Sequence, residues 1–250
     1  MLKVIAARLQ QGFRTVAYPD GPPTIPDRLR GLPLIHQDLC RKDCRRCAEA
    51  CPTEAITVDN DLTIDLGRCL FCGACAENCP TGAVHFSNDP RLAVSRREDL
   101  IIGKTGIKLA SEPERQIFGQ SIQLRQVSAG GCNGCEVDIN VLTTVVFDLS
   151  RFGIKIVASP RHSDGLLITG PVTQNMKSAT LDTFAAVPTP KLVIAVGTCA
   201  ISGGIFRDHA EQNNGATGLM PVDLFIPGCP PHPITILDGL LRLIGRIKEP

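Results

Sequence analysis

The sequence lacks three features that would each point to a class of protein: an excess of charge, a long apolar run and an export signal. Its 26 Lys and Arg residues balance 25 Asp and Glu residues, so no basic surplus favours nucleic acid as a partner. The longest apolar run, residues 192–201, is about half of the roughly 18 to 20 residues that cross a bilayer. No charged segment leads into an apolar stretch with a cleavage site, so we expect an intracellular chain.

What the sequence has instead is twelve cysteines. They could form six disulfides, three zinc sites or three iron–sulfur clusters. An exported disulfide scaffold would usually be shorter and denser in cysteine, which disfavours the first alternative. The spacing of the cysteines separates the other two.

The second of two cysteine runs has the spacing of a bacterial ferredoxin. Cys69, Cys72, Cys75 and Cys79 precede Pro80, which gives C-x2-C-x2-C-x3-C-P. In that pattern the first three cysteines bind one [4Fe–4S] cluster and the fourth binds the other cluster of the pair. Zinc sites usually use separated C-x2-C pairs instead.

The first run repeats the second with one irregularity. A shift of 28 residues maps Cys44, Cys47 and Cys51 onto Cys72, Cys75 and Cys79, and Cys40 alone is one residue out of register. We expect the extra residue to bulge from the loop and Cys40 to remain a ligand. Crossed ligation then predicts two ligand sets: Cys40, Cys44, Cys47 and Cys79; and Cys69, Cys72, Cys75 and Cys51.

The front of the chain divides into three predicted parts. Residues 1–35 form an amphipathic leader and linker. Residues 36–88 form an α+β ferredoxin-like module with short strands around a turn. Residues 89–120 form a solvated connector with charge clusters at 96–99 and 112–115. In the leader, apolar residues recur at helical spacing up to the Tyr18-Pro19 pair: Leu2, Ile5, Leu9, Phe13 and Val16. Its basic residues leave three alternatives open: a membrane surface, a partner, or the protein's own core.

Residues 121–250 have the rhythm of an α/β domain. Apolar runs at 122–127, 154–158, 166–169, 192–196 and 222–226 alternate with predicted helices at 136–149, 174–186 and 233–247. This alternation predicts a parallel sheet covered on both faces.

The last four cysteines all follow predicted strands of that sheet. Cys132 and Cys135 lie in a Gly-rich loop after the first strand, Cys199 follows the fourth and Cys229 the fifth. Ligands of such sheets bind beyond the carboxyl ends of the strands, so three loops can bring four thiols together. Scattered cysteines are usually buried structural residues, but glycines beside each of these let the backbone approach a bulky cluster.

The segments around these cysteines resemble the small subunit of group 4 membrane-bound [NiFe] hydrogenases, such as formate hydrogenlyase. They are residues 131–136 (Gly-Cys-Asn-Gly-Cys-Glu), 197–200 (Gly-Thr-Cys-Ala) and 227–231 (Pro-Gly-Cys-Pro-Pro). The resemblance, which extends to the terminal-cluster subunit of complex I, implies a flavodoxin-like fold and a third [4Fe–4S] cluster on these four cysteines. Two residues separate Cys132 from Cys135, as in hydrogenases, whereas the equivalent complex I cysteines are adjacent.

The front half resembles the two-cluster polyferredoxin-type subunit of the same complexes, on Tyr18-Pro19, residues 66–73 and residues 92–94. The chain therefore looks like a fusion of two electron-transfer subunits, enzymatic only within a complex. The resemblance implies three partners: a catalytic large subunit, membrane-embedded subunits, and a soluble ferredoxin or dehydrogenase subunit as electron donor. It also implies a place on the cytoplasmic face of the membrane. Alternatives are the equivalent subunit of a nickel-free complex I-like enzyme and a free-standing electron carrier.

Few other residues suggest chemistry. Glu136, directly after Cys135, is a candidate for proton handling, although a carboxylate at a helix start is also favoured by the helix dipole. His232 lies near Cys229, while Arg125, Arg161 and His162 are candidates for contact with the large subunit.

Overall fold

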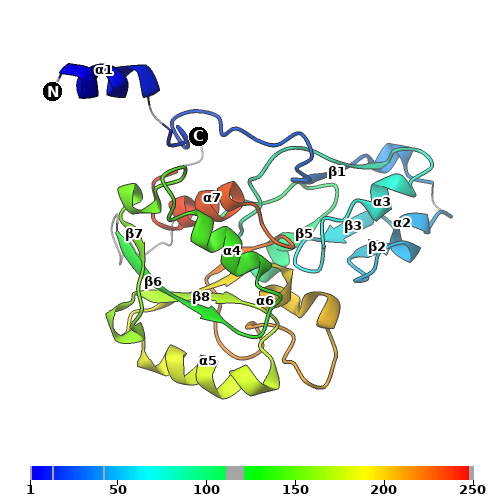
Figure 1. Cartoon of the computed structure of the whole chain (residues 1–250). Helices are drawn as coiled ribbons and strands as arrows, with labels where there is room; N and C mark the ends of the chain where they lie inside the picture. The colour runs from blue at the N-terminus through cyan, green and yellow to red at the C-terminus, as the bar shows by residue number, and fades with distance from the viewer. Residues whose placement is uncertain (1, 13, 42, 111–120, 248–250) are drawn as a thin grey trace.

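The computed structural model describes residues 2–12, 14–41, 43–110 and 121–247, so Phe13 and the charge cluster at 112–115 lie outside the described residues. The chain forms two lobes that lie side by side (Figure 1). The front lobe holds the two cysteine runs, and the back lobe holds the α/β domain.

The back lobe is built on a five-stranded parallel sheet with the order β10-β9-β8-β6-β7. Its strands are β6 (Ile122–Ser128), β7 (Ile154–Ile156), β8 (Gly165–Thr169), β9 (Leu192–Val196) and β10 (Leu224–Ile226). Helices α4 (Gly134–Val141) and α7 (Pro233–Leu243) cover one face, and α5 (Gln174–Ala186) covers the other (Figure 1). Short helices α6 (Thr198–Ser202), η3 (Leu149–Phe152), η4 (Pro160–His162) and η5 (Gly204–Phe206) complete the lobe.

The predicted parallel sheet is confirmed, and its central elements match the sequence pattern best. Strand β9 and helix α5 have the predicted bounds. Every residue of β8 is buried, as expected of a strand covered on both faces. Helix α7 is buried along its whole length and closes the core above the sheet.

The front lobe consists of small antiparallel sheets and two matching helical turns. The hairpin β2 (Ile56–Val58) and β3 (Leu62–Asp65) is extended by β5 (Ile101–Ile102), and β1 (Pro33–Ile35) pairs with β4 (Val84–Phe86). Helices α2 (Arg46–Glu49) and α3 (Ala74–Glu77) occupy equivalent places in the two cysteine runs, and η1 (Gln37–Leu39) and η2 (Arg97–Leu100) complete the lobe.

Two predicted helices are too long. The helix predicted at 136–149 ends at Val141, because the hydroxyls of Thr143 and Thr144 donate to the carbonyls of Asn140 and Val141 and compete with helical hydrogen bonds. The helix predicted at 233–247 ends at Leu243, before Gly245 takes a left-handed φ of 68°.

The expectation of a solvated connector is wrong for residues 89–110. Leu92, Ala93, Val94 and Leu100 are buried. Val94 exchanges two backbone hydrogen bonds with Phe225 on β10, the edge strand of the parallel sheet. Apolar side chains of this segment fill the space between the lobes, which therefore share one hydrophobic cluster.

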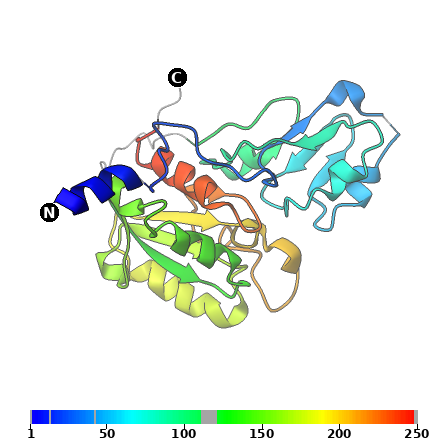
Figure 2. The same cartoon turned by 45° about the horizontal axis from the view of Figure 1, so that its top comes forward.

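Among the described residues of the leader, the helical ones are residues 2–11. Helix α1 (Leu2–Gln11) has no buried residue and projects from the body in both views (Figures 1 and 2). Packing against the protein's own core is therefore wrong for α1, whose side chains of Leu2 and Leu9 are 84% and 78% exposed.

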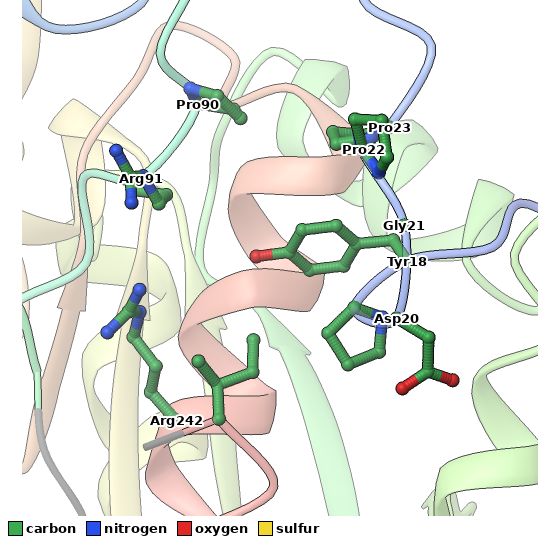
Figure 3. A pocket seen from close by; sticks show the side chains of 10 residues that line it. Tyr18, Asp20, Gly21, Pro22, Pro23, Pro90, Arg91 and Arg242 are labelled. Atoms are coloured by element: carbon green, nitrogen blue, oxygen red, sulfur yellow. The ribbon is translucent and has the colours of Figure 1, made fainter. Parts of the chain in front are cut away.

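The end of the leader, by contrast, is anchored on α7. The Tyr18 hydroxyl donates to the carboxylate of Asp238, whose other oxygen accepts from Arg242 Nε at 2.9 Å. Figure 3 shows Tyr18 pointing its hydroxyl across α7 toward the side where Arg91 and Arg242 lie. Burial, followed by the charge of Asp238, raises the pKa of Tyr18 far above its usual value.

Candidate iron–sulfur sites

The structure gathers the second predicted ligand set at one place in the front lobe. Cys51, Cys69, Cys72 and Cys75 line one pocket, although Cys51 belongs to the other run. The pKa of Cys69 is raised to about 12 and that of Cys75 to about 11, mainly by burial and in part by the neighbouring thiols of the set. These four thiols are therefore mutual neighbours, in the crossed arrangement that the spacing predicts.

The first predicted set is gathered in the same crossed way. Burial is the main cause of the raised pKa of Cys40, and Cys44 and Cys79 raise it further. Cys47 is likewise influenced by Cys40 and Cys79. The extra residue after Cys40 thus leaves its thiol beside the other three.

Matching hydrogen bonds hold the last cysteine of each run. The backbone N–H of Ala55 donates to Cys51 Sγ at 3.3 Å, and that of Ala83 donates to Cys79 Sγ at 3.2 Å. Burial opposes ionisation of Cys79, but hydrogen bonds from Thr81 and its neighbours outweigh it and lower the pKa. Such donors stabilise a thiolate and tune a bound cluster.

The third set lies at the carboxyl edge of the parallel sheet. Cys132 and Cys135 follow β6, Cys199 lies in α6 directly after β9, and Cys229 follows β10. Strands β6 and β8 are neighbours although β7 lies between them in the sequence, so the strand order reverses between them. The loop that carries Cys132 and Cys135 lies at this point. The pKa of Cys199 is raised to about 11, mainly by burial and then by the thiols of Cys229 and Cys132.

Two glycines provide the space for the third set. A Cβ on Gly197 would overlap Cys135 Sγ, and one on Gly204 would lie 2.8 Å from Cys199 Sγ. Both glycines also have a positive φ, of 88° and 58°, which other residues rarely adopt. The backbone at this edge is therefore shaped around the thiols.

Glu136 is buried beside this third set. Its Oε1 accepts hydrogen bonds from Ser128 Oγ and Thr169 Oγ1, both at 2.7 Å. The side chain is thus held by two strand-end hydroxyls, and it lies close enough for its charge to raise the pKa of Cys135, after burial and the thiol of Cys199. Glu136 also occupies the first turn of α4, so the favourable helix dipole applies as well.

The other positions singled out in the sequence are His232, Arg125, Arg161 and His162. His232 caps α7, where its Nδ1 accepts from the N–H of Ile234 at 3.2 Å, which supports a structural role. Arg161 and His162 are placed on η4, where His162 is exposed, and Arg125 is half-buried on β6.

Sequence reasoning missed the hydroxyls that connect the lobes. Thr198 Oγ1 donates to the carbonyl oxygen of Cys69 at 2.8 Å, and Ser202 Oγ donates to that of Gly67 at 2.7 Å. No local pattern indicates a contact across 129 residues, and only the position of Thr198 directly before Cys199 could have drawn attention to it.

The donor sets fit iron–sulfur clusters. Each contains four thiols, and they come with N–H donors to sulfur in the front lobe and a glycine cradle in the back lobe. Burial favours the neutral thiols of the metal-free protein, and coordination to iron would remove their protons. Within the described residues, no three His, Cys, Asp or Glu side chains are placed to hold one single metal ion.

The fold and the three sites define an iron–sulfur protein of the type found in oxidoreductase complexes. Comparisons with known proteins support this class. Residues 132–243 match the family described as NADH ubiquinone oxidoreductase, 20 Kd subunit, and residues 39–83 match the 4Fe-4S dicluster domain. The chain belongs to the first of these families and carries the second domain in front of it.

Three relatives illustrate the range of the family. "Formate hydrogenlyase subunit 7" of Escherichia coli (strain K12) is 45% identical over 52% of this chain and 51% of its own length, so the chain spans about half of that protein. "Probable membrane-bound hydrogenase subunit mbhJ" of Pyrococcus furiosus is 39% identical over 54% of this chain and 80% of its own length. An NADH-quinone oxidoreductase subunit of Carboxydothermus hydrogenoformans is 34% identical over 58% of this chain and 96% of its own length. In the part of this chain that the structure describes, no helix has the length and apolar character to span a bilayer.

Proposed function

We propose that this chain is the electron-transfer subunit of a membrane-bound [NiFe] hydrogenase or formate hydrogenlyase-type complex. It would hold three [4Fe–4S] clusters and pass electrons between a donor and a catalytic large subunit. The observation that carries this proposal is the gathering of twelve cysteines into three sets of four, two in one lobe and one in the other. Clusters bound there would supply one-electron transfer.

The sets divide between lobes that correspond to two kinds of subunit. We assign residues 36–88 to the two-cluster ferredoxin-like domain and residues 121–250 to the hydrogenase small-subunit-like domain. The strand order of the back lobe supports a flavodoxin-like fold, because counting its strands along the chain gives 2-1-3-4-5. Residues 89–110, which fill the space between the lobes, join them through one shared hydrophobic cluster.

The exposed edge of the third set is the proposed docking face for the large subunit. Cys132 and Cys229 are exposed, and the apolar side chains of Val137, Ile205 and Phe206 nearby are 51%, 60% and 42% exposed. A partner that covers this edge would exclude water from the site and come close to the thiols. Arg161 and His162, on η4, are proposed as separate positions for contact with the large subunit.

Attachment to the membrane is proposed through the complex, on its cytoplasmic face. Helix α1 contributes Leu2, Ile5 and Leu9 as an exposed apolar face, and it carries Lys3 and Arg8 but no acidic residue. Membrane-embedded subunits or the bilayer surface would cover this face. The front lobe would receive electrons from a soluble ferredoxin or dehydrogenase subunit.

Glu136 is proposed to handle protons beside the third set. Glu136→Gln keeps a side-chain oxygen for Ser128 and Thr169 but removes the carboxylate. Proton-coupled turnover of the intact complex should fall by about tenfold or more, the scale of a lost acid–base group. Undiminished turnover would leave only the structural role at the start of α4.

The alternative is the equivalent subunit of a complex I-like enzyme without nickel, which the relative from Carboxydothermus hydrogenoformans supports. The two-residue gap between Cys132 and Cys135 favours the hydrogenase assignment. The test is to purify the complex anaerobically through this chain and to measure nickel and the hydrogen-dependent reduction of methyl viologen. Stoichiometric nickel with hydrogen oxidation supports the proposal, whereas a complete complex without nickel supports the alternative.

A further inference from the structure

One buried hydroxyl joins the ligand loops of the two lobes. Thr198 is 1% exposed, and its Oγ1 lies within hydrogen-bonding distance of the carbonyl oxygens of Cys69, at 2.8 Å, and of Gly228, at 3.1 Å. Gly228 directly precedes Cys229, and Thr198 itself directly precedes Cys199. Three segments that carry proposed ligands therefore meet at this hydroxyl, one from the second set and two from the third.

A second contact holds the same loop of the front lobe against α6. Ser202 Oγ donates to the carbonyl oxygen of Gly67 at 2.7 Å. A Cβ on Gly67 would lie 2.9 Å from Ile201 Cγ2, so the loop approaches the helix as closely as only glycine allows. Residues 67–69 are thus fixed to α6 at both ends.

The loop is also held on its own side. Asp65 accepts from the N–H of Gly67 at 2.9 Å and forms a two-point ion pair with Arg97, at 2.9 and 2.6 Å. Paired guanidinium–carboxylate contacts of this kind define orientation as well as energy. The loop is therefore held in shape within the front lobe. If Cys69 moves relative to the back lobe, the hydrogen bonds to Thr198 and Ser202 on α6 must break.

We propose that Thr198 is a positioning residue that sets the separation between the second and third cysteine sets. This inference rests on the proposed function, since separation matters because electron transfer weakens steeply with distance. The Thr198 hydroxyl fixes the backbone of Cys69 to that of the Cys199 and Cys229 loops. Losing it leaves the carbonyl of Cys69 without this buried donor and weakens the junction.

The test compares Thr198→Val, which keeps the shape and removes the hydroxyl, with Thr198→Ser, which keeps the hydroxyl. Thr180→Val is the matched control, because Thr180 is equally buried and hydrogen-bonded to Met176 but lies on α5, which carries no cysteine. The full chain is purified anaerobically, its iron content is measured, and spin–spin interaction between its reduced clusters is recorded by electron paramagnetic resonance. Amide hydrogen exchange is followed in residues 66–69 and 197–200.

In Thr198→Val with unchanged iron, we expect weaker spin–spin interaction and roughly 5-fold to 100-fold faster exchange in both segments. Thr198→Ser should restore both, and Thr180→Val should change neither. Unchanged interaction in an iron-replete Thr198→Val protein would overturn the inference. If Thr198→Val loses iron, Ser202→Ala replaces it in the test, with the same expected direction and the same overturning result. Absence of any iron–sulfur signal in the unsubstituted protein would instead contradict the proposed function.

Discussion

The Tyr18 hydroxyl is hydrogen-bonded to the carboxylate of Asp238, across 220 residues of sequence. Asp238 is fully buried in α7, and Arg242 occupies its other oxygen. The irregular end of the leader is therefore packed against the core, although α1 before it is not.

Replacing Tyr18 with Phe tests this anchor. The substitution keeps the ring and removes a donor to a buried charge, so we expect the free energy of unfolding to fall by about 1–3 kcal/mol. Urea unfolding of the full chain measures it, with the exposed hydroxyl substitution Thr183→Val as control. An unchanged unfolding midpoint for Tyr18→Phe would show that the contact contributes nothing.

The same contact predicts a dependence on alkaline pH. Burial and Asp238 raise the pKa of Tyr18 above its unfolded value of about 10. The folded protein therefore holds the phenol proton of Tyr18 to a higher pH than the unfolded chain does. Because the unfolded tyrosine loses its proton first, the stability of the unsubstituted protein should fall with rising pH from about 10 upward, until the folded value is reached.

Tyr18→Phe has no phenol to ionise, so it supplies the reference for this effect. The stability difference between unsubstituted protein and Tyr18→Phe should be constant from pH 7 to about 9.5 and shrink above about 10. Urea unfolding at a series of pH values measures the difference. A difference that grows with pH would contradict the sign.

Cys40 is the ligand whose spacing departs from the ferredoxin pattern, so its substitution is informative. Cys40→Ala should remove about four iron atoms per chain, equal to one cluster. Leu39→Ala, at the neighbouring exposed residue, should remove none. Iron and sulfide analysis after anaerobic purification decides, and a full complement of iron in Cys40→Ala would exclude Cys40 as a ligand.

Helix α1 should matter for attachment and not for folding. The double substitution Ile5→Glu and Leu9→Glu places charge on exposed side chains, so the free energy of unfolding should change by less than about 0.5 kcal/mol. Recovery of the chain with membranes or membrane subunits should fall, while Gln10→Glu should leave it unchanged. A loss of more than about 1 kcal/mol of stability would mean that α1 packs on the protein itself.

The sequence predicted best those elements whose flanking residues end the strand or helix at the place where its apolar pattern ends. The apolar run of β9 between Lys191 and Gly197, and the helix of α5 before Pro188, are bounded by residues that end such elements. The crossed cysteine sets followed from the repeat. Each of these depends on residues close together in the chain.

Contacts between distant segments have no such local signal. Leu92 and Val94 are buried, and Val94 pairs with Phe225 on β10. The charged residues at 96–99 nearby in the sequence give no sign of this contact. The contact of Thr198 with Cys69 depends on how the lobes meet. The early end of α4 depends on the hydroxyls of Thr143 and Thr144, which compete for the carbonyls of the helix. The apolar pattern of the sequence continues past this point, so it did not predict the end of the helix.

The central claim is that twelve cysteines hold three clusters, and metal stoichiometry tests it most directly. Iron and acid-labile sulfide are measured on the full chain, purified without oxygen and without metal loss during handling. Three [4Fe–4S] clusters predict about twelve iron and twelve sulfide per chain. About eight iron atoms or fewer, in protein with all its cysteines intact, would contradict the account.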